Sequence, residues 1–424
     1  MLTPTPWSSL LPQRVELPEI SADDPPPGAA GTPMEAAAVP AKPAVYAILD
    51  QAHRPILLSS TANLRLGLLR RFSPPPFEKS SARRVNYRQI SRWVDYRQVS
   101  STFAANLWYL RAARLLYPDS YRRMLSWKPA WCIAVNADQE FPQLLGVPVT
   151  RAPMGQALGP FPDSASARLA IHVLEDTFDL CRYYDILRQA PHGKPCAYKQ
   201  MGKCPAPCDG SIDMVEYRQS IRMAVEFLVG REASSAGEAL EASAVRQAWR
   251  QGQEMQMRSA AAKLDFLAAA RIKSRISAVA GFSDERLAYV QRLSKLNFLI
   301  LQPGQSPLWM EPFFFQAGRI RAGQPVQKKR VHEALADWCN QINTPVTLTE
   351  SSGDDPSDLM SLLCYHLFRS RDSGLYIAAD QSVRPESIMD PIAGWCSQKQ
   401  RPADSMEQSS DAAGNSGPEQ GNSP

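Results

Sequence analysis

Four cysteines within 28 residues constrain this chain more than any other feature of its 424-residue sequence. Cys181 is followed after fourteen residues by Cys196, after seven more by Cys204 and after three more by Cys208. Gly and Pro residues separate the last three, so short loops can turn the sulfurs towards one centre. The ligand type fits both a [4Fe-4S] cluster and a four-thiolate zinc site, although the CxxC spacing typical of zinc sites is missing. Incidental or buried thiols are the alternative, because free cysteine packs as a small hydrophobic residue.

The chain shows no targeting signal. Its start, MLTPTPWSS, lacks the basic and apolar regions of a signal peptide, and no run approaches the ~18 apolar residues of a membrane helix. We therefore expect a cytoplasmic protein with no membrane partner. Its eight cysteines then stay reduced and do not form a disulfide framework.

Local patterns predict an α+β protein with several domains. The Pro/Ala-rich leader and the Ser/Gln/Gly-rich tail have no apolar period, and both are predicted to be disordered. Strands are predicted at 45–50, 55–59, 87–100, 127–135, 297–302 and 309–321, and helices at 63–72, 101–116, 165–178, 331–340 and 357–369. The predicted divisions are a leader (1–43), a small α+β unit (44–125), a four-cysteine segment (126–230), a helical region (231–294), an α/β region of unknown function (295–396) and a tail (397–424).

Positive charge is concentrated in residues 65–128. This segment holds fourteen Lys or Arg against three Asp or Glu, which gives +11 in a chain whose net charge is +5. Twelve of the fourteen are arginine, and aromatic residues lie between them, a pattern typical of surfaces that follow a nucleic-acid backbone and stack bases. A solvated charged face is the alternative. The DNA-binding candidates are Arg65, Arg70, Arg71, Arg83, Arg84, Arg88 and Arg92.

Residues 257–279 carry an apolar stripe with Arg and Lys outside it. Such a stripe packs into a core or binds a partner. Its members are Leu264, Phe266, Ala269, Ile272 and Ile276. No P-loop, GxGxxG or GxSxG pattern is present, so nucleotide hydrolysis and serine hydrolase chemistry have no support.

The cysteine segment carries a specific resemblance. CAYKQMGKCPAPCDGSIDMVEY at 196–217 resembles the C-L-Y-Y-Q-I-G-R-C-x-x-P-C-x-G-x-I-x-x-x-E-Y segment of the UvrC/Cho family, and LGPFPDSASA at 158–167 resembles its F-G-P-F-x-S-A segment. The resemblance covers residues 44–280, and a weaker similarity extends over 297–322. It favours a [4Fe-4S] cluster over zinc at the four cysteines. It also implies that 255–280 is a UVR motif, the helical hairpin through which UvrC binds UvrB.

The resemblance implies a GIY-YIG nuclease domain at 44–125, with a short antiparallel sheet flanked by helices. Only Tyr46 keeps a functional residue of that domain. The other functional positions hold Leu57 for the second tyrosine, Ser59 for the glycine, Ser60 for the lysine, Gly67 for the catalytic arginine, Arg71 for a Tyr or His and Tyr109 for the metal-binding glutamate. Without that glutamate and arginine the site loses both electrostatic contributions to phosphodiester cleavage, and Mg²⁺ is not expected to bind.

The leading hypothesis is therefore a repair-related accessory factor of the UvrC/Cho type that binds DNA and a UvrB-type protein and does not cleave DNA. The second nuclease domain of UvrC and its incision carboxylates are also expected to be absent. One alternative is an active endonuclease that incises on the 3′ side of a lesion with a shifted constellation of Tyr46, Arg65 and Glu78. The other is a metal-cluster scaffold or redox sensor that does not bind DNA.

Overall fold

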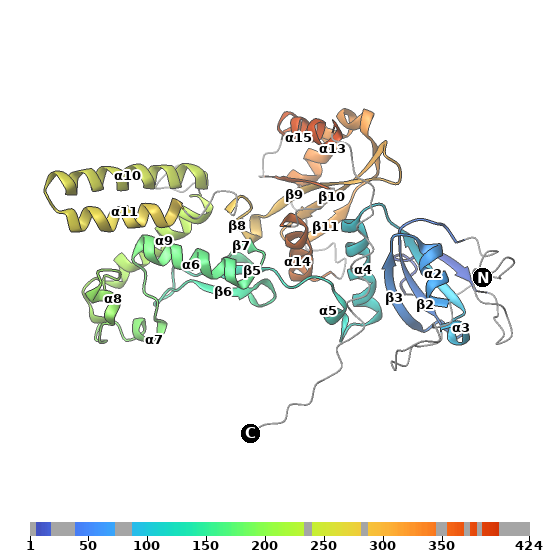
Figure 1. Cartoon of the computed structure of the whole chain (residues 1–424), viewed down its shortest axis with the longest axis horizontal. Helices are drawn as coiled ribbons and strands as arrows, with labels where there is room; N and C mark the ends of the chain where they lie inside the picture. Colours follow the sequence, from blue (N-terminus) through green and yellow to red (C-terminus); the bar gives the residue numbers. More distant parts are fainter. Residues whose placement is uncertain are drawn as a thin grey trace, which may run out of the picture.

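The protein is α+β, and its described residues form three antiparallel sheets with helices packed on them. The hairpin of helices α10 (Ala242–Ala262) and α11 (Phe266–Ala280) and the N-terminal sheet lie at opposite ends of the long axis in Figure 1. No helix in the part that the structure describes is both long and apolar enough to cross a membrane. The computed structural model describes residues 6–17, 39–72, 87–232, 240–280, 287–344, 354–368, 374–379 and 384–397. Residues 1–5 and 18–38 of the predicted leader and residues 398–424 of the predicted tail lie outside these ranges.

The N-terminal sheet has the strand order β1-β4-β2-β3, and every neighbouring pair is antiparallel. The hairpin predicted at 45–50 and 55–59 is confirmed as β2 and β3. The prediction of one strand over 87–100 is partly wrong. Residues Tyr87–Ile90 form a short helix, α3, and the strand is shorter than predicted, Trp93–Gln98 (β4). The elements are β1 (Gln13–Glu16), β2 (Ala44–Leu49), β3 (Pro55–Thr61), α2 (Leu64–Phe72), α3 (Tyr87–Ile90), β4 (Trp93–Gln98), α4 (Thr102–Leu116) and α5 (Tyr121–Met124).

Strand β1 corrects the prediction that the leader is disordered throughout. Gln13–Glu16 pairs with β4, with Val15 opposite Val94. The Arg14 guanidinium donates to both carboxylate oxygens of Asp95, at 2.5 and 2.7 Å. The indole of Trp7 donates to the same carboxylate at 2.9 Å. The leader thus contributes an edge strand, fixed by contacts to a strand about eighty residues later in the chain.

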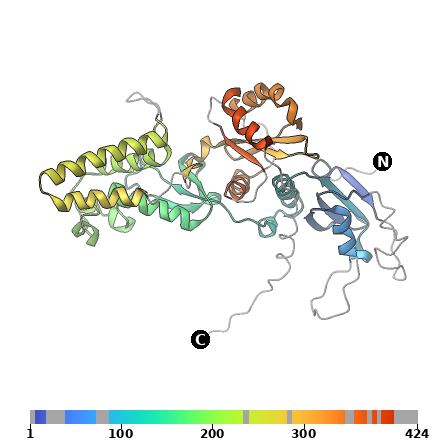
Figure 2. The ribbon, with the colours of Figure 1, turned by 45° about the horizontal axis from the view of Figure 1, so that its top comes forward.

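The two faces of β2 belong to different cores, because successive strand residues point to opposite sides. Val45, Ala47 and Leu49 pack with α4, and Tyr46 and Ile48 pack under α2. Helix α4 begins where Ser101 Oγ accepts a hydrogen bond from the backbone N–H of Ala104. Its buried residues belong to the same core as buried residues of the C-terminal sheet, so the N-terminal unit is joined to the rest of the molecule through α4 (Figures 1 and 2).

The middle sheet has the order β6-β5-β7-β8, and its core is shared with α6 and α9. The predicted strand at 127–135 and helix at 165–178 correspond to β5 and α6. Asp163 caps α6 by accepting from Ser166 N–H, and Asp213 caps α9 by accepting from Glu216 N–H. The elements are β5 (Trp131–Ala134), β6 (Leu145–Pro148), β7 (Ala157–Phe161), α6 (Ser164–Phe178), α7 (Tyr184–Leu187), α8 (Ala197–Gln200), α9 (Met214–Val229), α10 (Ala242–Ala262), α11 (Phe266–Ala280) and β8 (Gln291–Arg292).

The C-terminal sheet has the order β11-β10-β9-β13, and β12 also pairs with β10. One face packs on α14 and α4, and the other packs on α13 and α15. The single strand predicted over 309–321 is two strands, because Ala317 and Gly318 turn the chain with positive φ. The elements are β9 (Asn297–Pro303), β10 (Trp309–Gln316), β11 (Arg319–Ala322), β12 (Val326–Gln327), α13 (Val331–Asn343), α14 (Pro356–Leu367), β13 (Leu375–Ala378) and α15 (Pro385–Ser397).

Candidate functional site

Tyr46, the one retained nuclease residue, lies inside the protein. Only 1% of it is exposed, and it packs with Leu64, Leu68 and Phe72 of α2. On the neighbouring strands it stands opposite Ser59 and Tyr96. A nucleophile or acid/base group must reach the phosphate that it acts on. In this structure the Tyr46 phenol is enclosed on its own face of the sheet.

Strand β3 carries three positions at which the nuclease residues are replaced, and their side chains lie on both faces of the sheet. Leu57 packs against the same core as Tyr46, and Ser59 stands opposite Tyr46. Ser60 stands opposite Val45, whose side chain belongs to the α4 face. The positions of the second tyrosine and of the lysine are therefore split between the two sides of the sheet.

Gly67 marks a close approach between α2 and the end of β3. A Cβ added at Gly67 would lie 2.9 Å from the Thr61 hydroxyl oxygen. That oxygen is fixed, because it accepts from Asn63 N–H and donates to the Asn63 carbonyl. The helix packs too tightly here for an arginine without movement of Thr61, which gives a physical reason for glycine at this position.

Tyr109 packs against the core on the α4 side of the sheet, away from the Tyr46 core. Burial, together with the nearby Tyr117, raises the pKa of Tyr109 to about 12. Its phenol is therefore neutral at physiological pH. A neutral phenol does not replace a carboxylate as a ligand for a hard divalent cation.

The arginines predicted to bind DNA differ in their exposure and in their hydrogen-bond partners. Arg65 and Arg70 are exposed on α2, with Arg65 Nε donating to the Val39 carbonyl at 2.9 Å, and Arg71 is half-buried. Arg92 is held by the N-terminal segment, since it donates to Glu16 at 2.6 Å and to the Leu17 carbonyl at 3.2 Å. Arg83 and Arg84 lie outside the described residues, as does Glu78 of the shifted constellation, and the side chain of Arg88 is not described.

Other arginines of the basic segment hold the fold together. Arg97 donates to the carbonyls of Ser9 and Leu10 and stacks 4.0 Å from the Trp108 ring centre. Arg111 forms an ion pair with Asp354 at 2.8 Å. Arg122 pairs with Asp355 at 2.7 Å and with Asp358 at 3.1 Å. The +11 segment is therefore not one continuous binding face, because part of its charge is neutralised by distant carboxylates.

The four cysteines lie on one segment of the chain, which also contains the two short helices α7 and α8. Interaction between the Cys181 and Cys204 thiols lowers the pKa of Cys204 to about 7 and raises that of Cys181. Burial raises the pKa of Cys208, and the charges of Cys204 and Cys196 add to this. The thiols of Cys181, Cys204 and Cys208 thus influence one another, and Cys196 influences Cys208. No three His, Cys, Asp or Glu side chains of the described residues are arranged as a metal-binding group.

Backbone and charged contacts fix the cysteine loop. The N–H of Gly193 donates to the Cys208 carbonyl at 2.7 Å, and the buried Tyr217 hydroxyl accepts from Cys181 N–H at 3.2 Å. Arg182 lies 4.2 Å from the Tyr198 ring centre and forms an ion pair with Glu175 at 3.3 Å. Tyr198 and Tyr217 lie in the segment that carries the resemblance, but the sequence predicted no supporting role for them, because the fold alone brings their partners close.

The comparison with protein families decides what this segment is. Residues 130–227, which include the four cysteines, match the family described as "UvrC/Cho excinuclease, middle domain". Over this segment the chain is similar to the middle domain of the UvrC/Cho excinucleases. The resemblance read from the cysteine segment is confirmed.

UvrC relatives match well beyond the middle domain. "UvrABC system protein C" of Pseudomonas fluorescens (strain SBW25) is 26% identical over 58% of this chain and 37% of its own length. The protein of the same name from Salinispora arenicola (strain CNS-205) is 26% identical over 72% of this chain and 45% of its own length, and that of Pseudomonas protegens is 24% identical over 82% and 53%. The match thus spans about half or less of each relative. No solved structure matches the chain.

The region compared with the UvrC UVR motif is a hairpin of α10 and α11. Leu264 does not lie on a helical stripe as predicted, since it forms the turn with φ +60° and is 73% exposed. Phe266 is also exposed, whereas Ala269, Ile272 and Ile276 are half-buried along α11. The predicted stripe therefore divides into an exposed apolar tip and a packed inner part.

Helix α11 contacts the UvrC-type cysteine segment directly. Arg275 forms an ion pair with Asp179, which ends α6 two residues before Cys181. Arg271 lies against Gly202, where a Cβ would be 2.9 Å from the guanidinium and the backbone has φ +66°. Glycine is required there by both the backbone angle and the close approach. The hairpin and the cysteine loop thus form one connected unit.

Proposed function

We propose that this UvrC/Cho-family protein is a DNA-binding accessory factor related to nucleotide excision repair, with a GIY-YIG-like site that does not cleave DNA. The enclosure of Tyr46 in the core under α2 carries the proposal. Tyr109, at the metal-binding position, is a neutral phenol on the other side of the sheet. Phosphodiester cleavage needs an accessible reacting group, a metal carboxylate and a cation at the leaving phosphate.

The N-terminal sheet supports a GIY-YIG-like origin for this unit. The strand that carries Tyr46, β2, lies between β3 and β4, and all three are antiparallel. Helices α2 and α4 cover the two faces. The scaffold thus resembles the expected sheet flanked by helices, while every functional position except Tyr46 holds a different residue.

The cysteine segment is proposed to hold a [4Fe-4S] cluster, with zinc as the alternative metal. The donor set fits in chemical type, since four thiols lie on one segment and those of Cys181, Cys204 and Cys208 influence one another. Cys181, Cys196, Cys204 and Cys208 would be the ligands. A bound cluster supplies a redox centre and a cross-link within the loop. The protein's own residues position the loop through Tyr217 and Gly193.

The decisive experiment compares cleavage and binding with the same damaged DNA. We expect no Mg²⁺-dependent nicking of a damaged plasmid, together with binding that weakens steeply as salt rises, because phosphate contacts release counterions. Nicking is followed by conversion of supercoiled to open-circular DNA, and binding by fluorescence anisotropy of a labelled duplex at several salt concentrations. A nicking activity lost in Tyr46→Phe would establish an active endonuclease instead. No DNA retention at low salt would favour the metal-cluster scaffold.

Exposed arginines of α2 provide the matched test of the binding surface. The double variant Arg65→Gln/Arg70→Gln is expected to reduce the slope of log K against log salt by roughly 1 to 2, at about 0.9 per phosphate contact. Arg250→Gln removes a charge from the distant helix α10, where Arg250 pairs with Glu254 at 3.1 Å. This control should leave the slope unchanged. Equal effects of both changes would show that only overall charge matters.

The hairpin tip is proposed to bind a UvrB-type protein. Leu264, Phe266 and Leu267 are exposed together at the turn, and no residue of α10 or α11 is buried. We expect Phe266→Ser/Leu267→Ser to weaken the complex at least about tenfold, because exposed aromatic and aliphatic anchors dominate such interfaces. Isothermal titration with a purified UvrB-type protein measures this loss.

The matched control for the tip is Leu308→Ser. Leu308 is 72% exposed in the turn between β9 and β10, away from the hairpin. It should leave the affinity unchanged, and neither change should alter the melting temperature, since the replaced side chains are largely in water. Unaltered binding by the tip variant would exclude the tip as the contact surface.

A further inference from the structure

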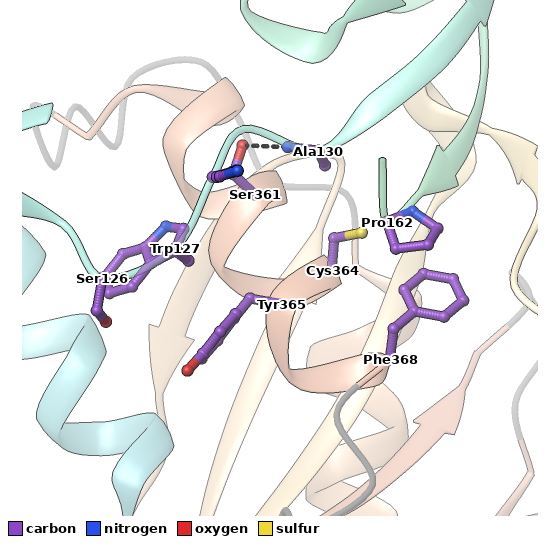
Figure 3. A pocket seen from close by; sticks show the side chains of 9 residues that line it. Ser126, Trp127, Ala130, Pro162, Ser361, Cys364, Tyr365 and Phe368 are labelled. Atoms are coloured by element: carbon purple, nitrogen blue, oxygen red, sulfur yellow. Dashed lines mark hydrogen bonds between the residues drawn. The ribbon is translucent and has the colours of Figure 1, made fainter. Parts of the chain in front are cut away.

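A cavity of about 430 Å³ opens where residues 126–130 cross helix α14 (Figure 3). Its walls come from three parts of the chain: this crossing segment, Pro162 after β7, and the C-terminal half of α14 with Phe368. The volume is within the range of small-molecule sites. The cavity is separate from the nuclease-like site, the cysteine loop and the hairpin.

Aromatic side chains form much of the cavity wall. The rings of Trp127 and Tyr365 lie 6.0 Å apart at an interplanar angle of 34°. Tyr365 and Phe368 lie three positions apart at the end of α14, and both line the cavity. The cavity therefore offers ring faces and edges against which a planar ligand can stack.

The wall is already fixed in the free protein. Trp127 is only 6% exposed and belongs to the central core. The N–H of Ala130 donates to Ser361 Oγ at 3.2 Å, which attaches the crossing segment to α14. The Cys364 thiol contacts the Phe161 carbonyl at 3.4 Å, which attaches β7 to the same helix. A ligand would therefore bind with little ordering of the protein, which favours affinity.

The charge of the lining selects the kind of ligand. Of the nine lining residues Lys128 alone is charged at neutral pH, its side chain is exposed, and no carboxylate is among them. Ser126 adds an exposed hydroxyl beside it. A planar aromatic group with an attached anion matches this combination, whereas a cationic ligand does not.

We propose that this cavity receives an unstacked nucleobase of a single DNA strand, which lies against Tyr365 and Phe368 with its phosphate near Lys128. Stacking on aromatic side chains contributes about 1 to 3 kcal/mol per base and tolerates every base type. The proposal rests on the DNA-binding function proposed above. It adds that the protein recognises single-stranded DNA at this cavity. A distorted or unpaired lesion site supplies such a base at low cost, because stacking there is already weakened.

The test uses the full chain and tryptophan fluorescence. A short oligodeoxythymidine strand is titrated into the wild type and three variants, Trp127→Phe, Tyr365→Leu and Lys128→Gln. We expect quenching in the wild type that is largely lost in Trp127→Phe. Tyr365→Leu should weaken single-strand affinity about tenfold, the equivalent of one lost stacking contact. Binding of an undamaged duplex should stay unchanged in all three variants.

Controls separate this proposal from the function on which it rests. Trp249→Phe changes a tryptophan that packs on Phe178 and Phe227 in the middle unit, and it should keep the quench. Lys128→Gln changes an exposed side chain, so it tests the cavity even where the Tyr365 variant does not fold. If these variants bind the single strand like the wild type while the duplex still binds, the cavity proposal is overturned and the proposed function stands.

The source of the base is decided by parallel titrations. Equal affinity for thymidine monophosphate and for the strand would assign the cavity to a free nucleotide, and tighter binding of the matching RNA strand would assign it to RNA. Either result overturns the proposal. If neither duplex nor single-stranded DNA is retained at low salt, the proposed function itself fails. Strand binding that depends on Trp127 and Tyr365 confirms the nucleobase site.

Discussion

Replacement of Cys204 by serine is expected to abolish metal binding by anaerobically purified protein. The wild type should contain one [4Fe-4S] cluster, with about four iron and four sulfide per chain, or one zinc if the site binds zinc. Cys204 is buried and its thiol interacts with that of Cys181, so the change removes one of the proposed ligands from the interior of the loop. Iron, sulfide and zinc analysis, together with visible absorption, measures the change.

The matched control for this experiment is Cys396→Ser. Cys396 is half-buried near the end of α15, far in sequence from the cysteine loop, and it should leave the metal content intact. Circular dichroism establishes that both variants are folded. Folded wild-type protein without iron or zinc would remove the cofactor proposal, as would unchanged metal content in Cys204→Ser.

Much of the secondary structure could be predicted because it is encoded locally. The apolar runs at 45–50 and 55–59 predict the β2–β3 hairpin, and the spacing of Leu64, Leu68 and Phe72 predicts α2. Strand β1 escaped prediction because QRVE is only four residues long and has no continuous apolar pattern. Its partner β4 lies about eighty residues away, and no local signal describes that pairing.

The sequence predicted which residue types the candidate sites contain. It did not predict their ion-pair partners or their backbone conformation. The spacing of the four cysteines predicts a shared centre, and this stays a prediction. The pKa shifts show that Cys181, Cys204 and Cys208 influence one another. The count of arginines did not reveal that Arg111 and Arg122 are paired with carboxylates more than two hundred residues later. Leu264 was placed on a helix because nothing in its sequence marks a left-handed turn, which glycine or asparagine usually occupies.

The same long-range pairing makes Asp95 the residue whose loss should destabilise the N-terminal unit most. Asp95 is 1% exposed, and its carboxylate accepts hydrogen bonds from Arg14 and Trp7. Asp95→Ala leaves the Arg14 guanidinium, whose side chain is 18% exposed, without its counter-charge. Removal of one partner of a buried ion pair costs about 3 kcal/mol or more. We expect a fall of this size in the free energy of unfolding, measured by urea denaturation.

Hydrogen exchange and a double-mutant cycle locate the cause of that loss. Faster exchange should be confined first to β1 and β4, because Arg14 and Trp7 attach the N-terminal segment to this edge of the sheet. If the Arg14–Asp95 pair is responsible, Arg14→Gln/Asp95→Asn should lose less stability than the sum of the single changes. Glu333→Gln breaks the exposed Arg330–Glu333 pair on α13 and should not shift the denaturation midpoint measurably. A loss in Asp95→Ala no larger than in this control would show that β1 is held mainly by its backbone hydrogen bonds to β4.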